Sequence, residues 1–169
     1  MHRLTIAIAA AFLAMGCAAE ADELPAPALE LTGRVVDAAN IIGAETEAQL
    51  VGELETLESD TGVQLVVATT PSLEGRSIDA YSLDLANAWA LGSAERNDGL
   101  MVLVAPTERQ VRIEVGLGLE ESVTDAEAQA IIDEAMSSAF RSGDFDGGII
   151  DGVERLKLEV APQDLKEAA

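Results

Sequence analysis

The sequence predicts an α/β fold, because two buried strand-like runs alternate with an amphipathic helical pattern in the order strand, helix, strand. The runs are residues 64–69 and 100–104, and both are rich in apolar residues, as expected of strands covered on both faces. A right-handed crossover between them predicts that the two strands are parallel. Residues 111–115 then alternate apolar and polar side chains, which predicts a hairpin partner with one wet face.

The ends of this hairpin gather polar and backbone-permissive residues, and we expect function at that rim. Residues 97–99 (NDG) lead into its first strand, and residues 116–120 (GLGLE) follow its second. The G-x-G within the second segment is not a dinucleotide fingerprint, because it follows a hairpin strand and lacks the third glycine before a helix. We expect it to turn the backbone so that Glu120 and Asp125 return toward Asp98.

The elements before the hairpin carry recognisable boundaries. Residues 31–37 predict a short edge strand. Residues 44–59 place leucines at helical spacing and precede Gly62, a residue typical of a helix C-cap. Ser77 is suited to N-cap the next helix, whose apolar residues recur on one face until the helix ends near Gly92.

Two helices are predicted after the hairpin. Thr124 and Glu127 form a T-x-x-E capping box, and apolar residues at helical spacing follow as far as Phe140. Residues 141–146 predict a turn, and apolar positions up to residue 156 predict a last amphipathic helix. That helix contains three glycines, which lower helix propensity, and we expect them to pack closely against the sheet.

The first residues indicate export. Residues 1–17 combine an early Arg3 with an apolar run that is too short for a transmembrane helix, which is typical of a secretory signal. Gly16-Cys17 resembles the lipobox of bacterial lipoproteins, in which the cysteine is acylated. Ala18 in the next position points, by resemblance to Gram-negative sorting, to an outer-membrane anchor facing the periplasm. Ordinary cleavage near Ala18 or Ala19, giving a soluble periplasmic or secreted protein, is the alternative.

The predicted organisation after the signal is a flexible tether (18–29), one domain (30–158) and a polar tail (159–169). The chain has 31 acidic and 10 basic residues and a formal net charge of −21, which argues against nucleic acid and favours cations or basic protein faces as partners. Its single histidine, His2, lies in the segment that is expected to be removed, and its single cysteine, Cys17, would carry the lipid. The mature domain therefore lacks the residues for Ser/His, Cys/His or common zinc chemistry.

Several segments, in the right order, resemble the TPM domain family. They are GRVVDAANII, TGVQLVVATTPSLEGRSIDAYS, W-x-L-G at residues 89–92, NDGLMVLVA, RQVRIEVGLGLE and TDAEAQAII. The resemblance covers residues 31–156 and implies a three-layer α/β/α sandwich with a mixed sheet of about four main strands. Members include thylakoid lumen proteins linked to photosystem II repair and many bacterial envelope proteins. Longer bacterial relatives add a C-terminal transmembrane helix, whose anchoring role a lipid on Cys17 would take here.

The family resemblance implies calcium binding for some members and weak acid phosphatase activity for a plant relative. In this sequence the candidate metal ligands are Asp98, Glu114, Glu120 and Asp125. Calcium takes about six to eight oxygens at flexible angles, so carboxylates and carbonyls from separate loops can suffice. The alternative for Asp98 is a turn chosen for its backbone preferences, and for Asp125 a favourable charge at a helix N-terminus.

Two function classes follow from these residues. The first is a non-catalytic envelope module that binds calcium and supports the assembly or maintenance of membrane-protein complexes. The second is a weak metal-assisted acid phosphatase, with Asp98 as nucleophile or metal ligand and Arg112 holding the phosphoryl group. The alternative for Arg109 and Arg112 is a structural pairing with Glu114 or Glu108. We rank the module first, because Asp98, the candidate nucleophile, does not belong to a D-x-D motif of carboxylate nucleophiles.

Overall fold

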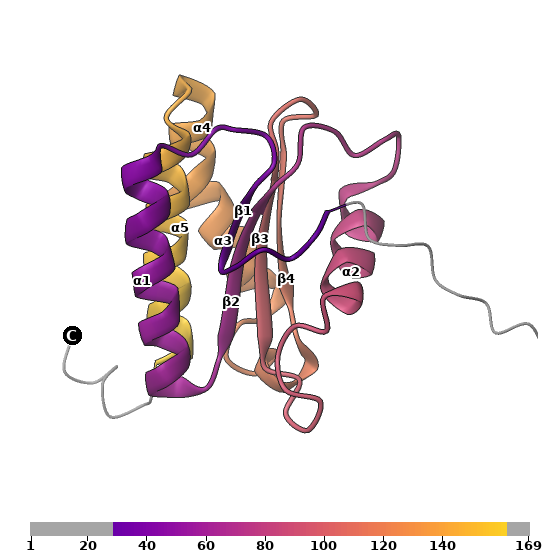
Figure 1. Cartoon of the computed structure of the whole chain (residues 1–169), viewed down its shortest axis with the longest axis vertical. Helices are drawn as coiled ribbons and strands as arrows, with labels where there is room; N and C mark the ends of the chain where they lie inside the picture. The colour runs from indigo at the N-terminus through magenta and orange to yellow at the C-terminus, as the bar shows by residue number, and fades with distance from the viewer. Residues whose placement is uncertain (1–28, 162–169) are drawn as a thin grey trace, which may run out of the picture.

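The computed structural model describes residues 29–161, which form an α/β domain of three layers (Figure 1). The central sheet is mixed, and its strands are, in spatial order, β1 (Val35–Asp37), β2 (Gln64–Thr69), β3 (Gly99–Ala105) and β4 (Gln110–Val115). The first three strands run parallel, and β4 pairs antiparallel with β3. The predicted crossover, hairpin and three-layer α/β/α arrangement are therefore confirmed.

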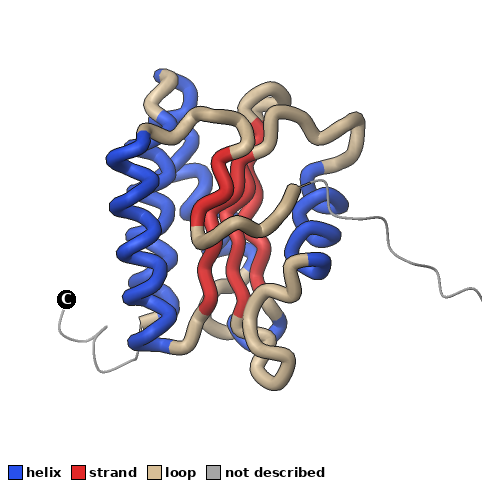
Figure 2. Tube along the Cα trace, viewed as in Figure 1, coloured by secondary structure: helices blue, strands red, loops and turns tan. Residues whose placement is uncertain are grey.

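Helices cover both faces of the sheet (Figure 2). One face carries α1 (Ala44–Thr61), α5 (Phe145–Val160) and a continuous run of α3 (Asp125–Ile131), the π-helical η2 (Ile132–Met136) and α4 (Ser137–Ser142). The other face carries α2 (Ile78–Ala88) alone, as far as residues 29–161 show. A short 3₁₀ turn, η1 (Leu117–Leu119), follows β4.

Strand β3 is the centre of the fold, because all seven of its residues are buried. Successive side chains of a strand point to opposite faces, so β3 contributes to two cores. Leu100 and Val102 pack with the leucines of α1 and with α5, whereas Met101 and Leu103 pack with α2 and Trp89. This double burial explains why the sequence of β3 is a continuous apolar run.

Three of the predicted helix boundaries are present as capping interactions, whereas α2 ends at Ala88 and not near Gly92 as expected. Gly62 closes α1 in the left-handed conformation, with φ 78°. The Ser77 hydroxyl accepts the N–H of Ala80 at the start of α2. Thr124 and Glu127 form the complete capping box at the start of α3. These local signals were sufficient to place the starts of two helices and the end of a third.

The glycines of α5 differ from the sequence expectation. A Cβ atom at Gly148 would lie 2.5 Å from Cε1 of Phe140, and one at Gly152 would lie 2.9 Å from Cγ of Met136. The expectation that these glycines pack against the sheet is therefore wrong. They allow α5 to approach α4 and η2, which are helical neighbours on the same face of the sheet.

The predicted signal segment and Cys17 lie outside the described residues, so lipidation stays a prediction. Within residues 29–161, no helix is long and apolar enough to cross a membrane. The described part of the chain includes all of the predicted domain (30–158) and the beginning of the predicted polar tail.

Candidate functional site

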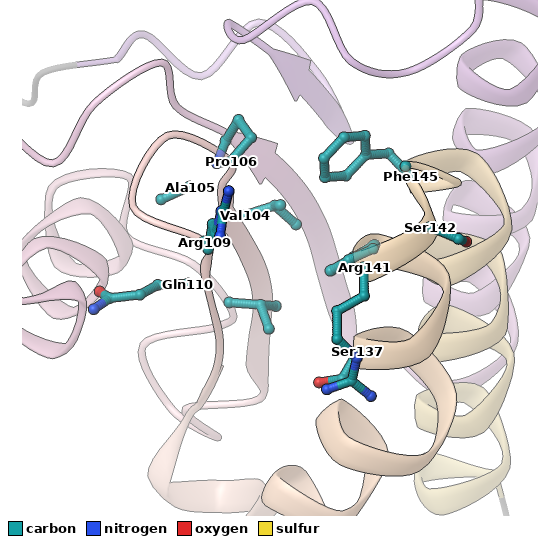
Figure 3. A pocket seen from close by; sticks show the side chains of 12 residues that line it. Val104, Ala105, Pro106, Arg109, Gln110, Ser137, Arg141, Ser142 and Phe145 are labelled. Carbon is teal, nitrogen blue, oxygen red and sulfur yellow. The ribbon is translucent and has the colours of Figure 1, made fainter.

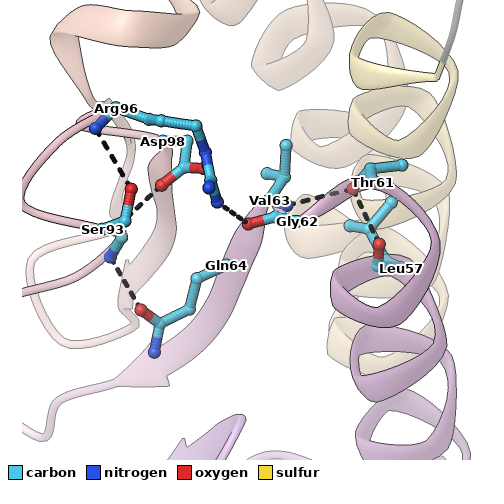
Figure 4. Close-up of polar contacts among 9 residues, drawn as sticks. Leu57, Thr61, Gly62, Val63, Gln64, Ser93, Arg96 and Asp98 are labelled. Carbon is cyan, nitrogen blue, oxygen red and sulfur yellow. Dashed lines mark hydrogen bonds and ion pairs between the residues drawn. The ribbon is translucent and has the colours of Figure 1, made fainter.

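Asp98 lies at the entry to β3 and is only 4% exposed. Its Oδ1 atom accepts the N–H of Ser93 at 2.7 Å, and its Oδ2 atom accepts the Nε–H of Arg96 at 2.5 Å (Figure 4). Both carboxylate oxygens thus bind the loop that leads from α2 into β3. This arrangement is the turn role that the Asn-Asp-Gly sequence allowed.

The same loop is tied to the start of β2. The Arg96 guanidinium donates to the carbonyl oxygen of Gly62 at 3.2 Å, and the Gln64 side chain accepts the N–H of Gly92 at 2.7 Å (Figure 4). The N–H of Gln64 in turn donates to the carbonyl oxygen of Asp98 at 3.1 Å. The loop around Asp98 therefore joins the end of α1, the start of β2 and the start of β3.

These contacts set the ionisation of Asp98. Burial by itself raises the pKa of this carboxyl, but the hydrogen bonds from Ser93 and Arg96 outweigh burial and hold the pKa below its usual value. Asp98 is therefore a carboxylate at neutral pH. Its charge stabilises the loop, and both of its oxygens are already hydrogen-bonded.

The G-x-G segment packs its backbone against this loop. The N–H of Gly118 donates to the carbonyl oxygen of Asn97 at 3.0 Å, and the N–H of Gly116 donates to that of Gly99 at 2.8 Å. A Cβ atom at Gly118 would lie 1.8 Å from the carbonyl oxygen of Arg96. Glycine is required there because two backbones touch, and the chain then enters η1.

A cavity of about 390 Å³ lies beside the loop, between α2, β4 and η1. Glu114 and Glu120 both line it, together with Asn87 and Asn97. The structure thus brings two of the four predicted metal ligands to one place. Asp98 does not line this cavity, and Asp125 is exposed in the first turn of α3.

The positions of Glu114 and Arg112 are fixed by α2. The Oε2 atom of Glu114 accepts the Ser82 hydroxyl at 2.8 Å and lies 3.4 Å from Nε of Arg112. Arg112 also lies 3.3 Å from a carboxylate oxygen of Asp79. The expected pairing of Arg112 with Glu114 is therefore present, while Asp98 has Arg96 as its own partner.

A cation in this cavity would need amide or main-chain oxygens in addition to carboxylates. Among residues 29–161, no group of three acidic, histidine or cysteine side chains could hold a metal ion. The oxygen donors that do line the cavity, Glu114, Glu120, Asn87 and Asn97, match the chemistry of calcium better than that of softer metals.

Sequence reasoning placed Asn97 at the rim of the hairpin but named neither asparagine as a ligand. Asn87 occupies an exposed position of α2, outside the apolar pattern that identified the helix. Asn97 was expected at the rim as part of the Asn-Asp-Gly turn, and its φ of 49° is consistent with a turn. No local pattern signals that these amides share a cavity with Glu114, because the contact depends on how α2 crosses β4.

Comparison with known proteins agrees with this fold. A sequence profile of the TPM domain matches residues 35–158, and the chain belongs to the TPM domain family. The solution structure of the N-terminal domain of a P. gingivalis protein superposes with a TM-score of 0.71 at 31% identity, covering 76% of this chain and 82% of that chain.

Two solution structures at 20% identity share the fold. The N-terminal domain of a Corynebacterium glutamicum protein has a TM-score of 0.61 and covers 78% of this chain and 82% of its own. A protein from the psychrophilic bacterium Bizionia argentinensis has a TM-score of 0.62 and covers 73% of this chain and 87% of its own. A comparison with curated proteins finds no match.

Proposed function

We propose that this domain is a non-catalytic binding module of the cell envelope that binds calcium at the cavity shared by Glu114 and Glu120. The observation that supports the proposal most is that these two glutamates line one cavity together with Asn87 and Asn97. Carboxylate and amide oxygens are hard donors, and calcium accepts them at flexible angles. The strongly acidic composition adds a general attraction for cations.

The contacts of Asp98 and Arg112 favour a module over a phosphatase. Both oxygens of Asp98 accept hydrogen bonds, and Arg112 lies between the carboxylates of Asp79 and Glu114. A phosphatase that used Asp98 as nucleophile and Arg112 as phosphate ligand would first have to break these charge-assisted interactions. The acid phosphatase alternative therefore ranks second in our proposal.

The partner class in this proposal is a membrane-protein complex of the envelope, whose assembly or maintenance the module supports. Two exposed leucines, Leu83 (50%) and Leu117 (72%), line the same cavity as Glu114 and Glu120 and provide apolar contact area. Negative charge across the chain favours a partner with a basic face. A lipid on Cys17 would keep the domain at the periplasmic side of the outer membrane.

Thermal unfolding with and without calcium tests the cation site. A ligand that binds only the folded state adds about 2.7 kcal/mol at a concentration of one hundred times its Kd, so calcium is expected to raise the melting temperature. Glu114→Gln and Glu120→Gln should each reduce that increase. Glu55→Gln is the matched control, because Glu55 is exposed on α1 and does not line the cavity. An equal calcium response in all four proteins would contradict the proposal.

A further inference from the structure

A larger cavity, of about 780 Å³, lies at the carboxyl end of β3 (Figure 3). One wall is the turn between β3 and β4, and the other is the corner at which α4 leads into α5. Ligands of open α/β sheets commonly bind at the carboxyl ends of the parallel strands. The volume is also in the range of small-molecule sites, about 300–1,000 Å³.

The charge of this cavity is opposite to that of the protein. Arg109 and Arg141 line it, and no acidic residue does, although the chain contains 31 acidic residues. The 390 Å³ cavity described above carries two glutamates, and a third cavity, against α1, carries Glu53 and Asp60. Of the three cavities, the one at the end of β3 is thus the one suited to an anion.

Both arginines have unused hydrogen-bonding capacity. Four other arginines of residues 29–161, namely Arg34, Arg76, Arg96 and Arg112, form ion pairs with carboxylates. Within the same residues, Arg109 and Arg141 form no ion pair or side-chain hydrogen bond. A guanidinium group is a planar fork of donors that suits a carboxylate or a phosphate, so two such groups at one cavity favour an oxyanion.

The two arginines come from opposite walls of the cavity. Arg109 lies in the β3–β4 turn, where it adopts a φ of 57° that is uncommon for a residue with a side chain. Arg141 lies in the last turn of α4, and its side chain extends toward Ser137, one turn earlier (Figure 3). The Ser137 hydroxyl adds a neutral donor to the lining.

An aromatic pair forms the apolar part of the lining. Phe140 and Phe145 both line the cavity, are partly buried, and have ring centroids 5.4 Å apart. The two carboxylates at this corner accept hydrogen bonds from the main chain. Asp144 accepts the N–H of Gly147, and Asp146 accepts the N–H of Gly43. Neither of these two aspartates lines the cavity.

We propose that this cavity binds a small oxyanion, a carboxylate or a phosphate ester, that carries an apolar or aromatic body. Arg109 and Arg141 would bind the anionic group from the two walls, and the body would pack against Phe140 and Phe145. No chemical step is implied, since binding alone follows from these contacts. The site is distinct from the cation site at Glu114 and Glu120, so either proposal can fail without the other.

The test is an NMR titration of the purified protein with benzoate, phenyl phosphate, inorganic phosphate and the neutral analogue benzyl alcohol, at constant ionic strength. Saturable shifts are expected at the β3–β4 turn and at the α4–α5 corner with benzoate or phenyl phosphate. The tighter of these two probes identifies the type of oxyanion. Inorganic phosphate and benzyl alcohol should each bind at least about tenfold more weakly than that probe, because each lacks one half of the proposed recognition.

Variants distinguish binding at this specific site from general electrostatic attraction to the protein. Arg109→Gln and Arg141→Gln should each lower the affinity for the tighter-binding probe about tenfold or more, because each removes a charge-assisted contact. Arg155→Gln is the matched control, since Arg155 is exposed on α5, forms no ion pair within residues 29–161 and lines none of the three cavities.

Three results would overturn the proposal. They are the absence of saturable binding of either oxyanion at millimolar concentration, equal binding of benzyl alcohol, and an equal loss of affinity in Arg155→Gln. The comparison of benzoate with benzyl alcohol needs no variant, so it remains decisive even if a substitution destabilises the fold.

Discussion

The Nε atom of Arg96 lies 2.5 Å from the Oδ2 atom of Asp98, at the point where the chain enters the central strand. The arginine side chain is 60% exposed, whereas that of the aspartate is 6% exposed. A buried carboxylate is thus stabilised by a partner that reaches it from the surface. This geometry gives the Asn-Asp-Gly segment a structural role at the junction of α1, β2 and β3.

Substitution of Asp98 is expected to destabilise the fold. Asp98→Asn removes the charge that binds Arg96 and should lower the free energy of unfolding by about 1–2 kcal/mol, since Arg96 is exposed and partly screened. Chemical denaturation of both proteins measures this difference. If stability is unchanged but the response to calcium is lost, Asp98 is a metal ligand and the structural assignment is wrong.

The pH dependence of stability provides an independent check on Asp98. The pKa of Asp98 in the folded protein lies below its ordinary value of 3.8. The stabilisation by the Asp98 carboxylate is therefore fully present above pH 3.8 and is lost as the pH falls through the lower pKa of the folded state. The stability difference between wild type and Asp98→Asn should therefore shrink below about pH 4. Melting curves from pH 7 to pH 3 measure it, and a constant difference over this range would contradict the assignment.

The contact between the G-x-G segment and the Asp98 loop predicts a large effect of one methyl group. Gly118→Ala would place a Cβ atom 1.8 Å from the carbonyl oxygen of Arg96, and we expect a loss of at least about 2 kcal/mol of stability. Gly52→Ala in the interior of α1 meets no atom within 4 Å and should stabilise the protein by about 0.5–1 kcal/mol. Similar effects of the two substitutions on denaturation would refute this account of Gly118.

Much of the fold could be predicted because its signals are local. The apolar run at β3, the alternation at β4 and the caps at Ser77 and Thr124 each depend on a few neighbouring residues. The π-helical segment η2 was not predicted, since the pattern from residue 124 to residue 140 suits one uninterrupted helix. The role of the α5 glycines also depends on which helix packs against them, and sequence spacing does not encode that.

The candidate sites were predicted only in part, because they depend on tertiary contacts. Glu114 and Glu120 were identified as oxygen donors near one rim, and they do share a cavity. The partner of Asp98 was missed, although Arg96 is only two residues away, because a turn residue gives no indication of where its carboxylate points. Arg141 was assigned to a turn, and its position across the cavity from Arg109 follows only from the packing of α4 against η2 and α5.

Membrane attachment is predicted to depend on Cys17, which lies outside the described residues. Cys17→Ser should release the protein from the membrane fraction or block its processing, because the acylated cysteine would be the anchor. Mass spectrometry of the mature N-terminus determines which residue comes first and whether it carries a lipid. A mature protein that begins at Ala19 or Glu20 without a lipid would instead establish ordinary signal cleavage.

The most direct test of the proposed function is isothermal titration of calcium into the purified protein. The account predicts saturable binding at or below millimolar calcium, weakened about tenfold or more in Glu114→Gln and in Glu120→Gln and unchanged in Glu55→Gln. Absence of binding at millimolar calcium in the wild-type protein, or binding that survives both cavity substitutions, would contradict a cation site at Glu114 and Glu120.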